Sequence, residues 1–257
     1  MAVTIDDIKK LRELTGVSMS ACKLALVDSE GNFDKAIEYL KKKGEAKMSD
    51  RAERTTLNGV ISVKISGKEA SIVKVLCETD FVARADDFIH LSDDLAEKLL
   101  VKKINESDTN LSEISDATLK LGEKIAIGDM KLVSGNVIGS YIHSNKKIGV
   151  VVVLKSGDES VARDIAMHIA AINPMVLSPD EVDQNLVNKE REIWVEQLKN
   201  ENKPSEIIEK ILIGKEKKFK EENALLKQNF VKDPSVLVED YLKINNSEIE
   251  SFVRFSV

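Results

Sequence analysis

VISVKIS at residues 60–66, followed closely by ASIVKVL at 70–76, is the stretch that decides the fold of this chain. Both segments are short and rich in β-branched residues, and Gly67-Lys68 stands between them, which is the pattern of an antiparallel β-hairpin with a tight turn. The same pattern returns at 138–144 (IGSYIHS) and 148–154 (IGVVVVL), with an Asn-Lys pair at its turn. We therefore predict two hairpins related by an internal repeat.

The repeat extends beyond the hairpins, because a helical pattern follows each of them. The hairpins align at an offset of 78 positions, whereas the helices that follow, centred on Leu95 and Ile165, align at an offset of 70. The first copy therefore has 8 extra residues between its second strand and its helix. The segment TDFVAR, at 79–84, lies in that insert.

The second copy makes the same passage from strand to helix without the insert, so the fold itself does not require it. Longer connections in compact domains carry function more often than short ones do. One interpretation is therefore that the aromatic ring of Phe81 is offered to another molecule. The alternative is that this ring is a local lid on its own hairpin.

The remainder of the chain extends this core on both sides. Residues near the N-terminus carry three short helical patterns with apolar stripes, and two long charged helical patterns separated near Asn200 follow Pro179, as in an antiparallel helical hairpin. We predict an α+β protein: a three-helix module (1–44), a charged linker (45–57), a first core repeat (58–134), a second core repeat (135–178), a protruding helical hairpin (179–228), and a C-terminal helix and strand that complete the core (229–257). An alternative for the charged linker is that part of it continues as an exposed helix.

Composition narrows the function classes. The 257 residues carry a net charge of −6, which argues against a dedicated nucleic-acid binder. The N-terminal residues are charged where a signal peptide is apolar, and no apolar run is long enough to cross a membrane. The two cysteines, Cys22 and Cys77, form no disulfide framework. We expect a cytoplasmic protein that binds neither membrane nor nucleic acid.

Motifs for catalysis are missing from the sequence. It contains neither the GxxxxGK[ST] loop nor the GxGxxG loop that cradle phosphates. The histidines, His90, His143 and His168, lack the spacing of a metal site on a helix. We therefore expect no enzymatic activity, no cofactor and no metal, although a site that uses Asp80 and Arg84 at a cleft is an alternative.

Four segments together resemble one family, bacterial elongation factor Ts, over essentially the whole chain. They are LRELTGVSMSACKLAL (11–26), TDFVAR (79–84), AMHIAAINP (166–174) and QNFVKDPS (228–235). The resemblance implies a guanine-nucleotide exchange factor for the GTPase elongation factor Tu, in its GDP-bound and nucleotide-free forms. It also implies a ubiquitin-associated type of fold for the N-terminal module and a coiled-coil arm, used for dimerisation in some members, for the helical hairpin. A homodimer through the helical hairpin or through the core is therefore one expected assembly of this chain.

The resemblance further implies which residues meet the partner. The exchange segment would insert beside the partner's magnesium ion and dislodge it; its residues here are Thr79, Asp80, Phe81 and Val82. Arg12, Met19 and His168 would make further contacts, although His168 also fits a satisfied core histidine. Some members continue beyond the position of Val257 into another helix, so we expect a weaker complex or compensating contacts. The rival interpretation is an adaptor whose N-terminal module binds a ubiquitin-like protein or a peptide.

Overall fold

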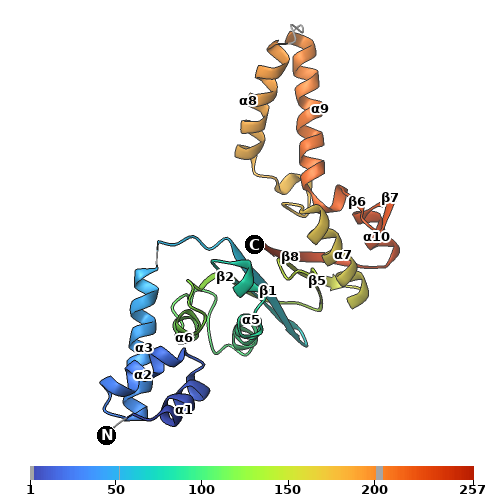
Figure 1. Cartoon of the computed structure of the whole chain (residues 1–257). Helices are drawn as coiled ribbons and strands as arrows, with labels where there is room; N and C mark the ends of the chain where they lie inside the picture. Colours follow the sequence, from blue (N-terminus) through green and yellow to red (C-terminus); the bar gives the residue numbers. More distant parts are fainter. Residues whose placement is uncertain (1–2, 52, 201–204) are drawn as a thin grey trace.

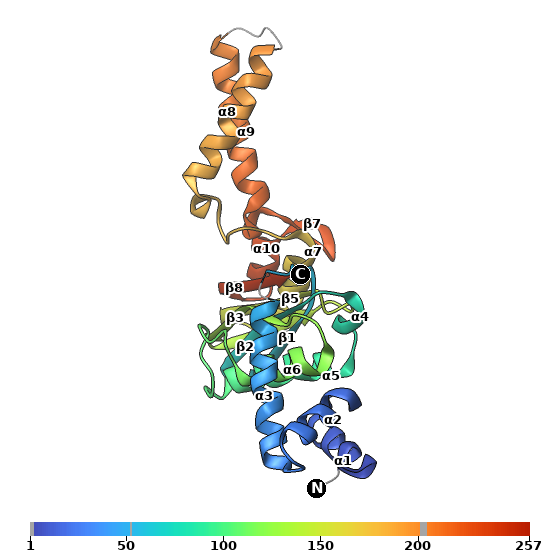
Figure 2. The same cartoon turned by 60° about the vertical axis from the view of Figure 1, so that its left-hand side comes forward.

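The computed structural model describes residues 3–51, 53–200 and 205–257 and confirms the α+β prediction (Figure 1). Three helices at the N-terminus form one end of the molecule, two three-stranded sheets with their helices form the middle, and a helical hairpin projects from the other end. Figure 2 shows the same order along the long axis from a second direction. None of the helices in the described ranges has both the length and the apolar character of a membrane span.

The N-terminal module contains α1 (Ile5–Thr15), α2 (Met19–Asp28) and α3 (Phe33–Asp50). Thr4 and Asp7 form a reciprocal capping box at the start of α1, and Gly16, with a φ of 68°, ends it in the left-handed conformation. The third helix continues six residues past the predicted module boundary at 44, into the range expected to be a linker. Helix α3 packs on α6 (Ser112–Leu121), where the backbone of Gly44 lies close to Ser115 and Leu119.

The first repeat is a sheet in the order β1-β2-β3, covered by helices. The predicted hairpin pairs β1 (Asn58–Ser66) with β2 (Glu69–Cys77), and Gly67 at the turn has a φ of 56°. An edge strand that was not predicted, β3 (Ala126–Ser134), pairs with β2. Helix α5 (Asp86–Leu100) packs on this sheet through Phe88, Leu95 and Leu99, which are buried with Val73 and Val75 of β2.

The second repeat is a sheet in the order β4-β5-β8, in which the C-terminal strand pairs with β5. Its elements are β4 (Val137–Ile142), β5 (Ile148–Ser156), α7 (Glu159–Ile172) and β8 (Glu248–Ser256). Strand β5 is buried on both faces: Val150 and Val152 pack with α7, whereas Val151 and Val153 pack with residues of the first sheet. Burial on both faces explains its unbroken apolar sequence.

The helical hairpin consists of α8 (Gln184–Asn200) and α9 (Ser205–Asn223). Trp194 and Phe219 meet edge to face with ring centroids 5.8 Å apart, and Arg191 of α8 pairs with Glu209 and Glu216 of α9. The predicted break extends to Pro204, but 201–204 lie outside the described residues. The second helix ends at Asn223, five residues before the predicted limit of 228.

The chain returns to the core after the hairpin through short elements. One 3-10 turn, η2 (Leu225–Lys227), follows the hairpin, and another, η1 (Pro179–Glu181), precedes it. After η2 come β6 (Asn229–Phe230), β7 (Asp233–Leu237) and α10 (Val238–Ile244), which lead into the final strand. Phe230 stacks on Tyr241 at 4.2 Å, so this segment packs tightly against the second repeat.

Candidate functional site

The predicted insert folds as one extra helical turn, α4 (Asp80–Ala83), between β2 and α5. Thr79 is its N-cap: the side-chain oxygen accepts a hydrogen bond from the Val82 N–H at 3.4 Å. The N–H of Arg84 closes the turn on the carbonyl oxygens of Asp80 and Phe81, at 3.2 and 3.3 Å. The second repeat passes directly from β5 to α7 at this position, so α4 is additional to the shared fold.

The side chains of α4 divide between the core and solvent. Ala83 is buried and Val82 is half-buried, and both pack on the core of the first repeat. Phe81 points the other way, with 83% of its surface exposed. The ring is therefore not a lid on its own hairpin in this structure. An exposed aromatic side chain on a rigidly anchored turn is available for contact with another molecule.

Asp80 lies beside Phe81 and pairs with Arg84, whose Nη2 atom is 2.8 Å from the Asp80 carboxylate. Both side chains line an open hollow of 390 Å³ between α4 and the turn of the second hairpin, where Lys146 and Lys147 lie. The hollow contains one carboxylate and three cationic side chains. Among the described residues, no cluster of His, Cys, Asp and Glu is arranged to hold a metal ion.

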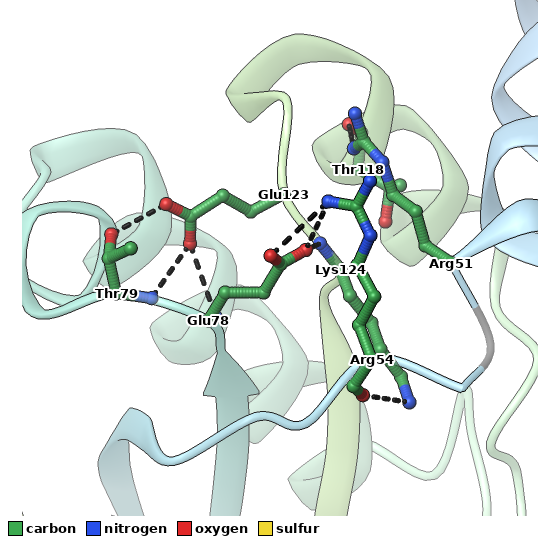
Figure 3. Close-up of polar contacts among 7 residues, drawn as sticks. All are labelled: Arg51, Arg54, Glu78, Thr79, Thr118, Glu123 and Lys124. Carbon is green, nitrogen blue, oxygen red and sulfur yellow. Dashed lines mark hydrogen bonds and ion pairs between the residues drawn. The ribbon is translucent and has the colours of Figure 1, made fainter.

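The base of the insert is held by a carboxylate that sequence reasoning missed. Glu123 follows α6 and accepts hydrogen bonds from the backbone of Glu78 and from both the backbone and the hydroxyl group of Thr79 (Figure 3). Glu78 in turn accepts from the Lys124 N–H and from Arg54. These hydrogen bonds hold the pKa of the Glu78 carboxyl below its ordinary value; the bond from the Lys124 N–H contributes most, and Arg54 contributes less.

Cys77, the last residue of β2, is buried next to the start of the insert. Its thiol donates to the carbonyl oxygen of Thr79 at 3.2 Å. Burial, and after it the nearby carboxylate of Glu123, raises the pKa of this thiol to about 12. Cys22, in the N-terminal module, is likewise a fully buried free thiol.

The structure places the other predicted contact residues apart from α4. Arg12 is exposed on α1, and Met19 is half-buried at the start of α2, where it packs on the core of the N-terminal module. His168 lies on α7 of the second repeat and is fully buried. Its imidazole does not face solvent in this structure, contrary to the expectation that it faces a partner.

The buried position of His168 has a clear cause in its hydrogen bonds. The Nε2 atom lies 2.9 Å from Oε1 of Gln228, and Nδ1 accepts from the Val231 N–H at 3.1 Å. Both partners belong to the segment that returns from the helical hairpin. The local motif could not reveal this environment, because the partners lie about 60 residues away in the chain.

Comparisons with known proteins show the family to which the chain belongs. A sequence model of the family described as "Elongation factor TS" matches residues 78–257, beginning at the residue before the N-cap of α4. Relatives named "Elongation factor Ts" include one from Hydrogenovibrio crunogenus, 43% identical over 100% of this chain and 92% of the relative. Another, from Marinobacter nauticus, is 41% identical over 100% and 91%, and one from Deinococcus deserti is 40% identical over 98% and 99%. On this evidence, the chain belongs to the elongation factor Ts family of translation elongation factors.

Proposed function

We propose that this chain is a guanine-nucleotide exchange factor for elongation factor Tu, and that Thr79, Asp80, Phe81 and Val82 form its exchange segment. The observation that carries the proposal is the position of Phe81. Its ring is 83% exposed on a turn that the shared fold does not require and that is anchored at its base. Family membership supports the identity of the partner.

The proposed mechanism is displacement of the partner's magnesium ion. Magnesium binds nucleotide phosphates with nearly ideal octahedral geometry, so a small shift of its ligands weakens its binding strongly. Insertion of Phe81 into the partner would contribute about 1.5–3 kcal/mol from burial of the ring. That free energy would hold the partner in a conformation that binds nucleotide weakly. Asp80 would add a negative charge beside the magnesium shell.

Linkage determines the direction of the effect. A factor that binds the nucleotide-free GTPase more tightly than the GDP-bound form weakens GDP binding by the same ratio. In catalytic amounts such a factor speeds nucleotide exchange in both directions without changing the final equilibrium, so the cellular nucleotide pool decides which nucleotide is loaded. This mechanism needs no covalent chemistry and no phosphate-binding loop in the chain itself.

The N-terminal module supplies the further contacts that we propose. Arg12 and Met19 lie on either side of the short connection between α1 and α2, which begins at Gly16. The neighbouring Leu14 is 70% exposed. These three residues, Arg12, Met19 and Leu14, form a contact surface that is partly polar and partly apolar, as in many interfaces with protein partners.

Association of two copies is a separate part of the proposal. Ile193, Ile207 and Ile213 of the helical hairpin are about half exposed or more, which supports a contact through this arm. Light scattering of the full chain, compared with a variant that carries Ile193→Glu and Ile213→Glu, measures whether the arm forms a dimer. A monomeric wild-type chain would contradict this part alone.

The test of the exchange function is release of fluorescent GDP from elongation factor Tu, measured with and without this chain. We expect acceleration that saturates with the concentration of the factor, together with a weaker affinity of the GTPase for GDP when the factor is bound. Release that is unchanged at saturating concentrations of the wild-type chain would contradict the proposal.

A further inference from the structure

The base of the exchange segment donates three hydrogen bonds to one acidic side chain that comes from a distant part of the chain. We infer that Glu123 is the positioning residue of this segment: it sets the direction of Phe81 without contacting the partner. The inference rests on the proposed function, because it assigns to Glu123 a role in that function. It also makes a claim about the free chain that can be tested without the partner.

The grip of Glu123 uses both oxygens of its carboxylate. Oε2 accepts from the N–H groups of Glu78 and Thr79, at 3.1 and 2.9 Å, and Oε1 accepts from the Thr79 hydroxyl group at 2.5 Å. Figure 3 shows the carboxylate facing the backbone just before α4. Three hydrogen bonds to one anionic group fix both the position and the orientation of that backbone.

Thr79 transmits this constraint to the exchange segment. Its hydroxyl oxygen caps the Val82 N–H, and its carbonyl oxygen accepts from the Ala83 N–H at 3.2 Å. Phe81 lies within the turn that these two bonds close. A helix of four residues is not stable by itself, because one turn cannot offset the cost of nucleation. The orientation of the ring therefore depends on where Glu123 holds Thr79, together with the packing of Val82 and Ala83 on the core.

The hydrogen bonds between the segment of Glu123 and the segment of Glu78 run in both directions, which makes this connection rigid. While Glu123 accepts from the backbone of Glu78, the Glu78 carboxylate accepts from the backbone N–H of Lys124 at 2.6 Å. Each of the two neighbouring segments thus supplies a carboxylate that accepts from a backbone N–H of the other. Arg54, on the segment between the N-terminal module and β1, donates to the same Glu78 carboxylate at 3.2 Å.

Glu123 itself is fixed by the end of α6. Gly122, with a φ of 79°, ends that helix in the left-handed conformation, and its N–H bonds to the carbonyl oxygen of Thr118. Arg51 donates to the same carbonyl oxygen at 3.4 Å. Helix α6 packs on α3 of the N-terminal module, so the anchor of the exchange segment directly follows a packed helix.

The first part of the test compares Glu123→Ala with a matched control. Glu106 also accepts a backbone N–H, from Leu132 at 2.8 Å, and pairs with Lys131, but it contacts neither Glu78 nor Thr79. We expect Glu123→Ala to lower the second-order rate constant of GDP release by at least about tenfold, the loss that corresponds to one charge-assisted hydrogen bond. Glu106→Ala should change it by less than about twofold, and Glu123→Gln, which keeps one carbonyl acceptor, should lie between the two.

The second part separates positioning from general destabilisation. If Glu123 acts only through the ring, Glu123→Ala should have almost no further effect on GDP release in a Phe81→Ala background. In the free chain, hydrogen exchange of the amides at 79–83 should become at least about tenfold faster in Glu123→Ala than in Glu106→Ala. Losses that multiply in the double variant, or amides that stay equally protected, would overturn the inference.

The two readouts also separate this inference from the proposed function. If the wild-type chain does not accelerate GDP release, the exchange proposal fails, and hydrogen exchange alone decides whether Glu123 holds α4. If the wild-type chain accelerates release and Glu123→Ala does so equally well, only the role of Glu123 is overturned.

Discussion

His168 and Gln228 form a buried hydrogen bond of 2.9 Å that joins α7 to the segment returning from the helical hairpin. The neighbouring groups determine the proton positions. The Val231 N–H can only donate, so Nδ1 accepts; the Gln228 amide nitrogen donates to the Glu222 carbonyl oxygen at 2.7 Å, so its Oε1 accepts from Nε2–H. The imidazole is therefore neutral, and a second proton at Nδ1 would face a donor.

This arrangement predicts a pH dependence of stability. Burial lowers the pKa of His168 below its ordinary value of 6.5. Below pH 6.5 the unfolded chain binds a proton that the folded chain excludes, so the free energy of unfolding should fall as the pH decreases towards 5, by at most about 1.4 kcal/mol per pH unit. Denaturant titrations of the wild type and His168→Gln measure this slope, which the substitution should reduce.

His90→Gln is the control for that measurement, because His90 is exposed on α5. It should retain the wild-type slope between pH 6.5 and 5. Equal slopes in the wild type and in His168→Gln would show that this imidazole does not titrate differently on folding.

The sequence predicted the central fold because its signals there are local. Alternating β-branched residues and turn residues mark each hairpin, and their register, such as Ser66 opposite Glu69, follows from the turn. Strand β3 escaped prediction because an edge strand is only partly buried; Gly128, Asp129 and Lys131 interrupt its apolar pattern. The sequence left open whether α3 continues past residue 44, because the charged stretch there has almost no large apolar residues to form a stripe; the structure extends the helix to Asp50.

The residues of the candidate site likewise include some that local sequence signals revealed and others that depend on distant parts of the chain. Comparison of the two repeats was enough to identify α4 as an insert and Phe81 as its spare aromatic residue. Glu123 carries no local signal, because its hydrogen-bond partners lie 44 and 45 residues earlier. The burial of His168 likewise depends on Gln228, so similarity of the surrounding motif could not decide whether its side chain faces a partner.

Replacement of Phe81 tests the mechanism most directly. We expect Phe81→Ala to lower the acceleration of GDP release by about 10- to 150-fold, which corresponds to burial of the ring in the complex. Because the side chain is largely exposed, the free energy of unfolding should change by less than about 0.5 kcal/mol. Measurement of GDP release and of denaturant stability on the same variant tests both statements.

Val101→Ala provides the matched apolar control. Val101 is 50% exposed at the far end of α5, about 22 Å from the end that adjoins α4. It should leave GDP release unchanged. Full acceleration by the Phe81→Ala protein would rule out the ring as the wedge.

Replacement of Asp80 and of Arg84 tests whether the Asp80 carboxylate itself, or its ion pair with Arg84, supports GDP release. Asp80→Ala should lower GDP release by about threefold to tenfold, the range for one hydrogen bond lost in the complex. Arg84→Ala removes the same exposed pair but leaves the carboxylate, so its effect on release should be smaller. An equal loss in both variants would show that the pair, and not the carboxylate, supports exchange.

The thiol of Cys77 reports whether the base of the exchange segment opens. Because its pKa is raised to about 12, the thiolate fraction at pH 8 is only about one in ten thousand, and the side chain is buried. In a Cys22→Ala background, we expect reaction with an aromatic disulfide reagent to be at least about a thousandfold slower than that of the unfolded chain. Absorbance of the released thiolate measures this rate.

An accessible cysteine calibrates the same assay. Ser156→Cys, at an exposed position at the end of β5, should react quickly in the folded Cys22→Ala protein, while Cys77 remains protected. The Cys77 thiol donates to the carbonyl oxygen of Thr79, so its exposure requires that the segment before α4 move away from β2. Rapid reaction of Cys77 in the folded chain would mean that this segment opens readily, and Phe81 would then lack the rigid base on which its proposed insertion depends.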